Sequence, residues 1–297
     1  MEKTSVIYFS KDRPLQLELA ITTNNLSTLG FNEYRKNVEQ VVIYKASNKE
    51  YEEAYRNIAR DFPNVMFLNE NEQATFRQRL LYAIRPNDFV LFVTDDTVFV
   101  KDYSLKDCVE LLSERKEVFG VSLRLGMNTT MCYPHKKPNN MPGGYIRHKD
   151  FLLYEWPLVG FGDFGYPLEL SSSVYDTYYI MPILENFQYE NPNELEWIMS
   201  KRATVYEHAC PLMACYESSR AFSIPANKVR HSVFNQGNLN RVGTNPENNP
   251  DNLLKLFNEG YVIDIDPLMD YVPQACHEEI DFSFVRIGEE DKENNED

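Results

Sequence analysis

The sequence predicts an α/β fold: a mixed, mostly parallel sheet flanked by helices, with a small C-terminal extension. In the first hundred residues, short apolar runs alternate with helix-like segments, which is the pattern of successive β-α-β units. Residues 89–93 are apolar at five successive positions, as expected for a central strand that is covered on both faces. The composition, with 43% hydrophobic and 25% charged residues over 297 positions, is that of a globular protein with a large core.

The first part of the chain alternates strands and helices in a regular order. Apolar runs predict strands at residues 5–9, 41–44, 65–68 and 89–93. The segments between them predict helices at residues 13–26, 50–61 and 73–84. Pro14 suits a first helical turn, because its missing N–H would have no partner there.

After residue 102 the pattern becomes less regular. Helices are expected at residues 106–115, 175–187, 192–203 and 253–258, strands at 119–123 and 261–265, and a turn or linker at 244–252. Residues 131–150 contain three prolines, two adjacent glycines and two histidines. This segment is therefore expected to form a long loop or lid.

The formal net charge of −15 limits the classes of partner. It argues against a surface that holds the phosphates of long nucleic acid or anionic lipid, although a local basic pocket is compatible with it. Residues 289–297 carry six carboxylates and one lysine. We expect a disordered acidic tail there, and at most peripheral contact with a membrane.

The apolar runs are strand-sized and fall short of the roughly 20 residues that span a bilayer. The first residues lack the features of a signal peptide. The five cysteines are an odd, scattered set without a CxxC pair. These features predict a cytoplasmic protein with reduced thiols rather than a zinc site.

The sharpest local feature is the acidic pair Asp95 and Asp96, which directly follows the strand predicted at residues 89–93. In open α/β sheets ligands bind beyond the carboxyl ends of the strands, so both carboxylates should face a crevice. Adjacent acids at such a place repel one another, and a divalent cation that bridges to substrate phosphates relieves the repulsion. The alternative is that both acids only cap the next turn.

Polar residues also follow the other predicted strands at the same edge of the sheet. The loop after the first strand offers a hydroxyl, two cations and a helix N-terminus, which suit a nucleotide base or diphosphate but also an ordinary polar turn. Arg77 is either aimed at a phosphate or a solvated surface arginine. The candidates for binding the nucleotide at this edge are Phe9, Ser10, Lys11, Arg13, Tyr44, Ser47, Asn69, Arg77 and Asp95.

The order of these motifs resembles nucleotide-sugar glycosyltransferases of the GT-A fold, of the family-two-like kind found in bacterial polysaccharide gene sets. The resemblance runs from about residue 5 to residue 241. It begins with Val-Ile-Tyr-Phe-Ser-Lys-Asp-Arg-Pro-Leu-Gln-Leu at residues 6–17 and continues with Thr94-Asp95-Asp96. It implies that Asp96 binds a metal under the donor diphosphate, with Asp95 beside it in contact with the donor.

Two further elements of the resemblance lie in the middle of the chain. The loop Gly160-Phe-Gly-Asp163-Phe-Gly-Tyr-Pro corresponds to a loop that approaches the donor sugar and the acceptor, which makes Asp163 a catalytic candidate. Residues 168–172 read Leu-Glu-Leu-Ser-Ser where many relatives have Leu-Ser-Leu-Asp-Gly. The segment Asn191-Pro-Asn-Glu-Leu-Glu-Trp implies that Glu196, or alternatively Glu194, is the base that deprotonates the acceptor hydroxyl. Glu194 also fits a helix-start carboxylate.

The last element is the stretch at residues 215–231, which resembles the family's Ser-Lys-x-x-Asn-Ile-Pro-x-Asn-Arg-Val segment. Its Lys228 and Arg230 are placed to neutralise the leaving diphosphate. Its His231 has the position of a further metal ligand, with His208 as the competitor. Trp156 and Trp197 are candidates for stacking on a sugar, although most aromatic residues belong to the core.

The resemblance implies a metal-dependent glycosyltransferase, with Mn²⁺ or Mg²⁺ as cofactor. It would move a sugar from a nucleotide diphosphate donor to a hydroxyl of a glycan or lipid-linked glycan, with inversion. A retaining transferase and a non-catalytic glycan-binding relative are the alternatives. Residues 1–243 would form the catalytic domain, with a nucleotide-binding half at 1–101 and an acceptor half at 102–243, followed by the extension at 244–288 and the tail at 289–297.

Overall fold

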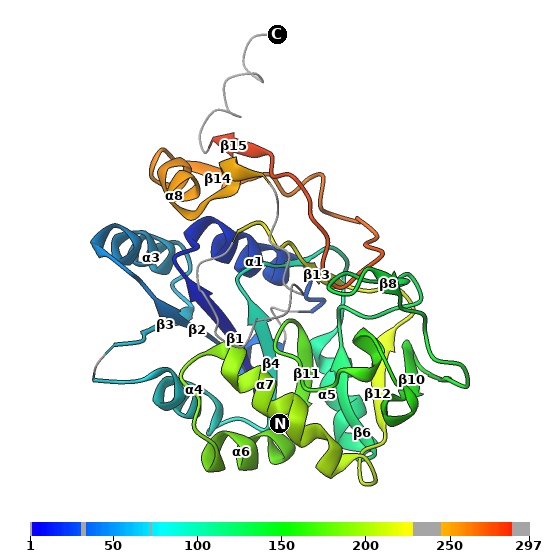
Figure 1. Cartoon of the computed structure of the whole chain (residues 1–297). Coiled ribbons are helices and arrows are strands. Elements are labelled where there is room, and N and C mark those ends of the chain that lie inside the picture. The colour runs from blue at the N-terminus through cyan, green and yellow to red at the C-terminus, as the bar shows by residue number, and fades with distance from the viewer. Residues whose placement is uncertain (1, 31–33, 72, 228–244, 287–297) are drawn as a thin grey trace.

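The computed structural model describes residues 2–30, 34–71, 73–227 and 245–286 (Figure 1). A nine-stranded sheet with the order β3-β2-β1-β4-β11-β6-β12-β10-β9 lies at its centre. Only β11 and β10 run opposite to the other strands of this sheet. The mixed, mostly parallel sheet that the sequence predicts is therefore confirmed. The strands of the sheet are β1 (Thr4–Lys11), β2 (Val38–Lys45), β3 (Val65–Asn69), β4 (Phe89–Thr94), β6 (Val118–Ser122), β9 (Ile146–His148), β10 (Phe151–Glu155), β11 (Ser173–Asp176) and β12 (Leu212–Tyr216).

Helices cover both faces of the sheet (Figure 1). On one face α4, α6 and α7 pack against inward residues of β1 such as Ile7 and Phe9. On the other face α1, α3 and α5 pack against the alternate residues Val6 and Tyr8. The helices are α1 (Pro14–Ser27), α3 (Lys49–Asp61), α4 (Phe76–Ile84), α5 (Leu105–Glu114), α6 (Thr177–Asn186), α7 (Pro192–Arg202) and α8 (Pro250–Asn258). Shorter 3-10 turns lie at Arg35–Asn37, Trp156–Leu158, Asp163–Gly165, Ala203–Tyr206 and Pro246–Asn248.

The elements predicted for the first hundred residues are all present, with ends that differ by a few positions. The predicted helix at residues 175–187 is different, because its first residues belong to β11. This strand pairs antiparallel with β4 and β6, and α6 begins only where the Asp176 side chain accepts a hydrogen bond from the Tyr178 N–H at 2.9 Å. Tertiary pairing thus overrides the local helical pattern.

The predicted loop at residues 131–150 contains more regular structure than expected. Its first part forms a small hairpin of β7 (Met131–Cys132) and β8 (Lys137–Pro138), and its last part is the edge strand β9. The pair β5 (Thr97–Phe99) and β13 (Ala221–Ser223) lies beside the main sheet. None of these short strands has a clear apolar alternation in the sequence.

The C-terminal extension packs on the main domain and then returns to its centre. Helix α8 lies against α1 and α3, and β14 (Tyr261–Ile263) pairs with β15 (Phe284–Arg286) above α1 (Figure 1). Between these strands, Ala275 bridges to Met131 and His277 bridges to Ser223. The segment 274–279, called the return segment below, therefore lies between the β7–β8 hairpin and β13. None of the helices in the described part of the chain combines the length and the apolar character needed to span a bilayer.

Candidate active site

A cavity of about 710 Å³ opens at the carboxyl ends of β1 and β4. The loops that follow these strands form one wall, and the loop at 159–166 with the start of α7 forms another. The β7–β8 hairpin and the return segment contribute further surface. The edge of the sheet at which the sequence predicts a crevice is therefore the edge that carries the cavity.

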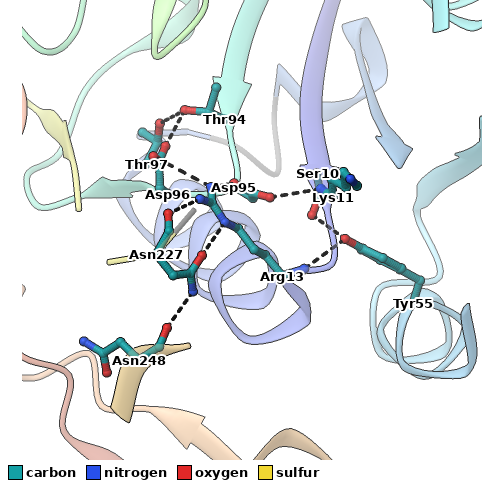
Figure 2. Close-up of polar contacts among 10 residues, drawn as sticks. All are labelled: Ser10, Lys11, Arg13, Tyr55, Thr94, Asp95, Asp96, Thr97, Asn227 and Asn248. Carbon is teal, nitrogen blue, oxygen red and sulfur yellow. Dashed lines mark hydrogen bonds and ion pairs between the residues drawn. The ribbon is translucent and has the colours of Figure 1, made fainter. Parts of the chain in front are cut away.

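The half-buried Arg13 and the buried Asp95 anchor the wall below β1 and β4. The Arg13 Nη1 donates to Asp95 Oδ1 at 2.8 Å, and the Lys11 N–H donates to Asp95 Oδ2 at 3.2 Å (Figure 2). The Arg13 Nε also donates to Asn227 Oδ1 at 2.8 Å. Burial alone would lower the pKa of the Arg13 guanidinium, but Asp95 and Asp96 raise it above its usual value. Arg13 is thus a charged and fully engaged side chain, and both oxygens of Asp95 are occupied.

Asp96 presents a more open carboxylate to the same cavity. Its Oδ1 accepts a hydrogen bond from the Thr94 hydroxyl at 2.7 Å (Figure 2). Its main-chain oxygen accepts one from the Ile224 N–H at 2.8 Å. Its Oδ2 lies 4.0 Å from Arg13 Nη1. The backbone and one oxygen are therefore fixed, while the second oxygen is available for a ligand.

The return segment brings His277 to the cavity wall. Its Nδ1 is buried and has no hydrogen-bond partner within the described ranges. Burial, with a smaller contribution from Arg124, lowers the pKa of the His277 imidazole. No signal in the sequence singles out this residue, because it lies beyond the predicted linker and in no recognisable motif.

Of the two histidines that the sequence singles out, only His208 belongs to the described residues. His208 is 98% exposed beside Glu207 and does not line the cavity. His231 lies outside the described residues, as do Lys228 and Arg230. The role of these three residues stays a prediction.

A carboxylate from α7, Glu196, reaches the cavity opposite the Asp96 side. Its Oε1 accepts a hydrogen bond from the Leu170 N–H at 3.2 Å. Burial raises the pKa of Glu196, which Arg124 partly offsets. By contrast, Glu194 does not line the cavity, because its carboxylate folds back and accepts from the Glu190 N–H at 2.8 Å. Glu194 therefore acts as a helix-start carboxylate, which was the alternative for it.

The glycine loop contributes Asp163, which lines the cavity and pairs with Asn139. The Asn139 amide donates to Asp163 Oδ2 at 3.2 Å, and the Asp163 N–H donates to Asn139 Oδ1 at 3.0 Å. Gly162 has a φ of 92°, and a Cβ on it would collide with the Asn139 side chain. A glycine is therefore required at this position for the loop to approach the cavity.

A second buried ion pair, Arg124 with Glu169, lies behind the opposite wall. Arg124 Nε is 3.5 Å from Glu169 Oε2, and the two side chains are 4% and 2% exposed. The Glu169 carboxylate also accepts hydrogen bonds from the Ser171 N–H and the Ser173 hydroxyl. Ser172 has a φ of 103° at the position where the resembled sequences have glycine. The turn thus keeps a backbone conformation that suits glycine although the residue has changed.

Four predicted nucleotide-binding residues do not line the cavity, because structural contacts occupy them. Tyr44 and Asn69 donate to Glu52 on α3, at 3.2 and 2.6 Å. Ser47 donates to Asp12 from its N–H and its hydroxyl, at 2.7 and 2.6 Å. Arg77 donates to the carbonyl oxygens at the end of α6, including Glu185 O at 2.7 Å.

The next residue along two of these strands faces the cavity instead. Lys45 and Glu70 line it, and Lys45 Nζ lies 2.7 Å from Glu70 Oε1. Phe9, Ser10, Lys11 and Arg13 line it as the sequence predicts. Successive residues of a strand point to opposite sides, so a one-residue error in the sequence interpretation selects the wrong face.

The two tryptophans have different surroundings. Trp156 is buried, donates from Nε1 to Cys210 O at 2.8 Å, and stacks on Phe119 with ring centroids 6.0 Å apart. Its predicted stacking on a sugar is therefore wrong, because the ring is part of the core. Trp197 is 50% exposed, next to Glu196 on α7.

No protein-family model matches the sequence. The bifunctional glycosyltransferase pgtA of Dictyostelium discoideum is 24% identical to this chain over 186 residues, which cover 57% of this chain and 23% of the relative. The matched region is thus less than a quarter of the length of that protein.

Solved structures with a similar arrangement include a mannosyltransferase and a protein in complex with UDP. The mannosyltransferase PcManGT from Pyrobaculum calidifontis, in complex with GDP-Man and Mn²⁺, matches with a TM-score of 0.44 and 14% identity, over 73% of this chain and 55% of that chain. S. aureus TarS 1-349 in complex with UDP matches with a TM-score of 0.48 and 14% identity, over 74% and 60%. Likeness at this level does not assign an activity to this chain.

Proposed function

We propose that this chain is a glycosyltransferase that moves a sugar from a nucleotide diphosphate donor to a hydroxyl of a glycan or lipid-linked glycan. The observation that carries this proposal is the single cavity in which Asp96, at the end of β4, and Glu196, on α7, both present a carboxylate. The nucleotide would lie against the 1–101 half and the acceptor against the 102–243 half. The partial sequence match to a glycosyltransferase supports the same reaction class.

A divalent cation, Mn²⁺ or Mg²⁺, is part of this proposal. Within the described ranges no three His, Cys, Asp or Glu side chains form a group that could hold a metal ion by themselves. Asp96 and His277 do line the same cavity, and the buried Nδ1 of His277 has no hydrogen-bond partner among the described residues. We assign the metal to these two side chains, with donor oxygens and water as the other ligands. The bound ion would offset the charge that builds up on the leaving diphosphate.

The side chains of the two walls have separate tasks in this reaction. Lys11 and Lys45 contribute positive charge on the side of the nucleotide, while Arg13 holds Asp95 and the strand ends in place. Glu196 accepts the proton of the acceptor hydroxyl. The Leu170 N–H fixes one oxygen of Glu196, so the other oxygen is free to contact that hydroxyl. This arrangement favours direct displacement with inversion.

Nucleotide binding tests the proposal directly. Titration calorimetry with UDP and GDP, with and without Mn²⁺, should give binding that the metal strengthens. The variant Asp96→Asn should lose the effect of the metal, whereas the matched variant Asp61→Asn, an exposed carboxylate at the end of α3, should keep it. Absence of binding for every nucleoside diphosphate, also with metal, would refute the proposed function.

The stereochemistry of the product tests the role of Glu196. NMR of the first-formed product should show an anomeric configuration opposite to that of the donor. Retention would leave the transferase intact but would remove Glu196 as the base.

A further inference from the structure

The guanidinium of Arg124 is buried at the cavity wall without the hydrogen bonds that a buried cation needs. The side chain is 4% exposed, and the residue lines the cavity. Its Nε has no hydrogen-bond partner, and the guanidinium donates to none of the residues in the described part of the chain. Glu169 is its only ion-pair partner there, at 3.5 Å. Buried donors left in this state are costly, so oxygen atoms of a ligand are the expected partners.

The charges around Arg124 indicate what kind of oxygen it binds. Burial alone would lower the pKa of Arg124, but Glu169 raises it, with smaller contributions from other groups that include Asp163 and Glu196. The positive charge of Arg124 is thus already balanced by Glu169, and Asp163 and Glu196 are among the acids that line the same cavity. An additional anion would be repelled by these carboxylates. A neutral oxygen acceptor is therefore the better ligand.

Sugar hydroxyl groups match this arrangement. Each hydroxyl can accept a hydrogen bond from a guanidinium N–H and donate one to a carboxylate. Arg124 offers the donors, and Asp163 and Glu196 offer acceptors in the same cavity. Arg124 and Asp96 both influence the pKa of Glu196, so both charges lie near its carboxylate. A sugar ring bound to Arg124 would therefore lie between the diphosphate end and the base.

We infer that Arg124 is a specificity-determining residue that binds hydroxyl groups of an uncharged donor sugar, with Glu169 as its fixed counter-ion. This inference rests on the proposed function. It predicts that the chain prefers a nucleotide-linked neutral hexose to a donor whose sugar carries a carboxylate. The sequence did not single out Arg124, because a lone arginine after a strand has no motif.

The test compares two dissociation constants for each variant in the presence of Mn²⁺. Calorimetry with a nucleoside diphosphate measures the affinity of the nucleotide half of the cavity. Calorimetry with the matching hexose donor measures the affinity that includes the contacts of the sugar. In Arg124→Met the affinity for the hexose donor should fall by roughly 10- to 100-fold, while the affinity for the diphosphate changes less than about twofold. The matched control is Arg147→Met, which removes an exposed guanidinium paired with Glu217.

Loss of Arg124 alone leaves Glu169 buried and unpaired, so folding needs a separate check. The double variant Arg124→Met/Glu169→Gln removes both charges and should show the same selective loss. Retained diphosphate binding demonstrates that each variant is folded at the site. In a series of monodeoxy hexose donors, one member should lack the hydroxyl that Arg124 contacts, and it should bind the wild type and Arg124→Met equally.

Each failure has a different meaning. If the wild type binds neither nucleoside diphosphates nor their sugars, the proposed function falls, and this inference falls with it. If diphosphates bind and the Arg124 variants bind the hexose donor as tightly as the wild type, only this inference is overturned. Tighter binding of a uronic acid donor than of a hexose donor would also overturn it, because Arg124 would then bind an anion.

Discussion

Two arginine–carboxylate pairs lie at the same cavity and differ in how completely they are hydrogen-bonded. In the pair Arg13–Asp95, the guanidinium donates to Asp95 at 2.8 Å and to Asn227 at 2.8 Å (Figure 2). In the pair Arg124–Glu169, the carboxylate has other donors, but the guanidinium donates to no residue in the described ranges. The protein alone supplies the hydrogen-bond partners of the first pair, as expected for a structural element. The second becomes complete only with a ligand, which is the mark of a binding element.

The largest expected effect concerns the wall that carries Arg124. Glu196→Gln removes the proton acceptor but keeps the shape of the side chain and its contact with Leu170. The turnover number should fall by about 10²- to 10⁴-fold, with unchanged affinity for the nucleoside diphosphate. Steady-state kinetics and calorimetry measure the two quantities. Glu190→Gln, an exposed carboxylate just before α7, serves as the control and should leave both unchanged.

Breaking the pair Arg13–Asp95 should instead lower the free energy of unfolding. Arg13→Met leaves the carboxylate of Asp95 buried without its cation. The free energy of unfolding should fall by about 3–5 kcal/mol, because the desolvation of Asp95 is no longer compensated. Urea denaturation followed by circular dichroism measures the change. A loss below about 1 kcal/mol would mean that the pair is not the structural element described above.

The pH dependence of the reaction tests the pair that contains Arg124, because this arginine influences the pKa of Glu196. Burial raises the pKa of Glu196 above its usual 4.5, Arg124 lowers it, and Glu169 and Asp96 raise it. The ionised form is the base, so kcat/KM should rise with pH as Glu196 loses its proton. In Arg124→Met the lowering influence is gone, and this rise should move to higher pH. In Arg124→Lys, which keeps the charge, the rise should stay near its wild-type position.

The smallest effect is expected at the turn that supports Glu169. Ser172 has a φ of 103° and is fully buried, and its hydroxyl has no hydrogen-bond partner within the described ranges. Ser172→Gly relieves the backbone and removes the unpaired hydroxyl, so stability should rise by about 1 kcal/mol. Thermal unfolding of the two proteins measures this difference. A lower melting temperature for the glycine variant would show that the serine is not under strain.

The sequence predicts the first half of the fold and one wall of the site well. Strands β1 to β4 have strong local apolar runs, and the residues that follow β1 and β4 reach the cavity as expected. The local sequence pattern predicts strands less well where the strands that pair are far apart in the sequence. The local pattern therefore predicts a helix where the second half of β11 lies, and it predicts neither β10 nor β12.

The missed site residues share a physical reason. Arg124 and His277 act through neighbours that are far away in the sequence, and neither belongs to a motif. Tyr44 was preferred to Lys45 because the sequence indicates where a strand ends but not which side its last residue faces. Trp156 looked like a binding residue because a lone tryptophan beside a glycine loop carries no sign of its burial. These are properties of packing, which local periodicity does not encode.

The return segment determines at which stage of synthesis the wall of the cavity can be completed. Residues 274–279 supply part of its wall, although most of the other lining residues precede residue 197. During synthesis from the N-terminus, the sheet can form while this wall is still inside the ribosome. The nascent chain therefore holds an open, unfinished cavity until residue 279 has emerged.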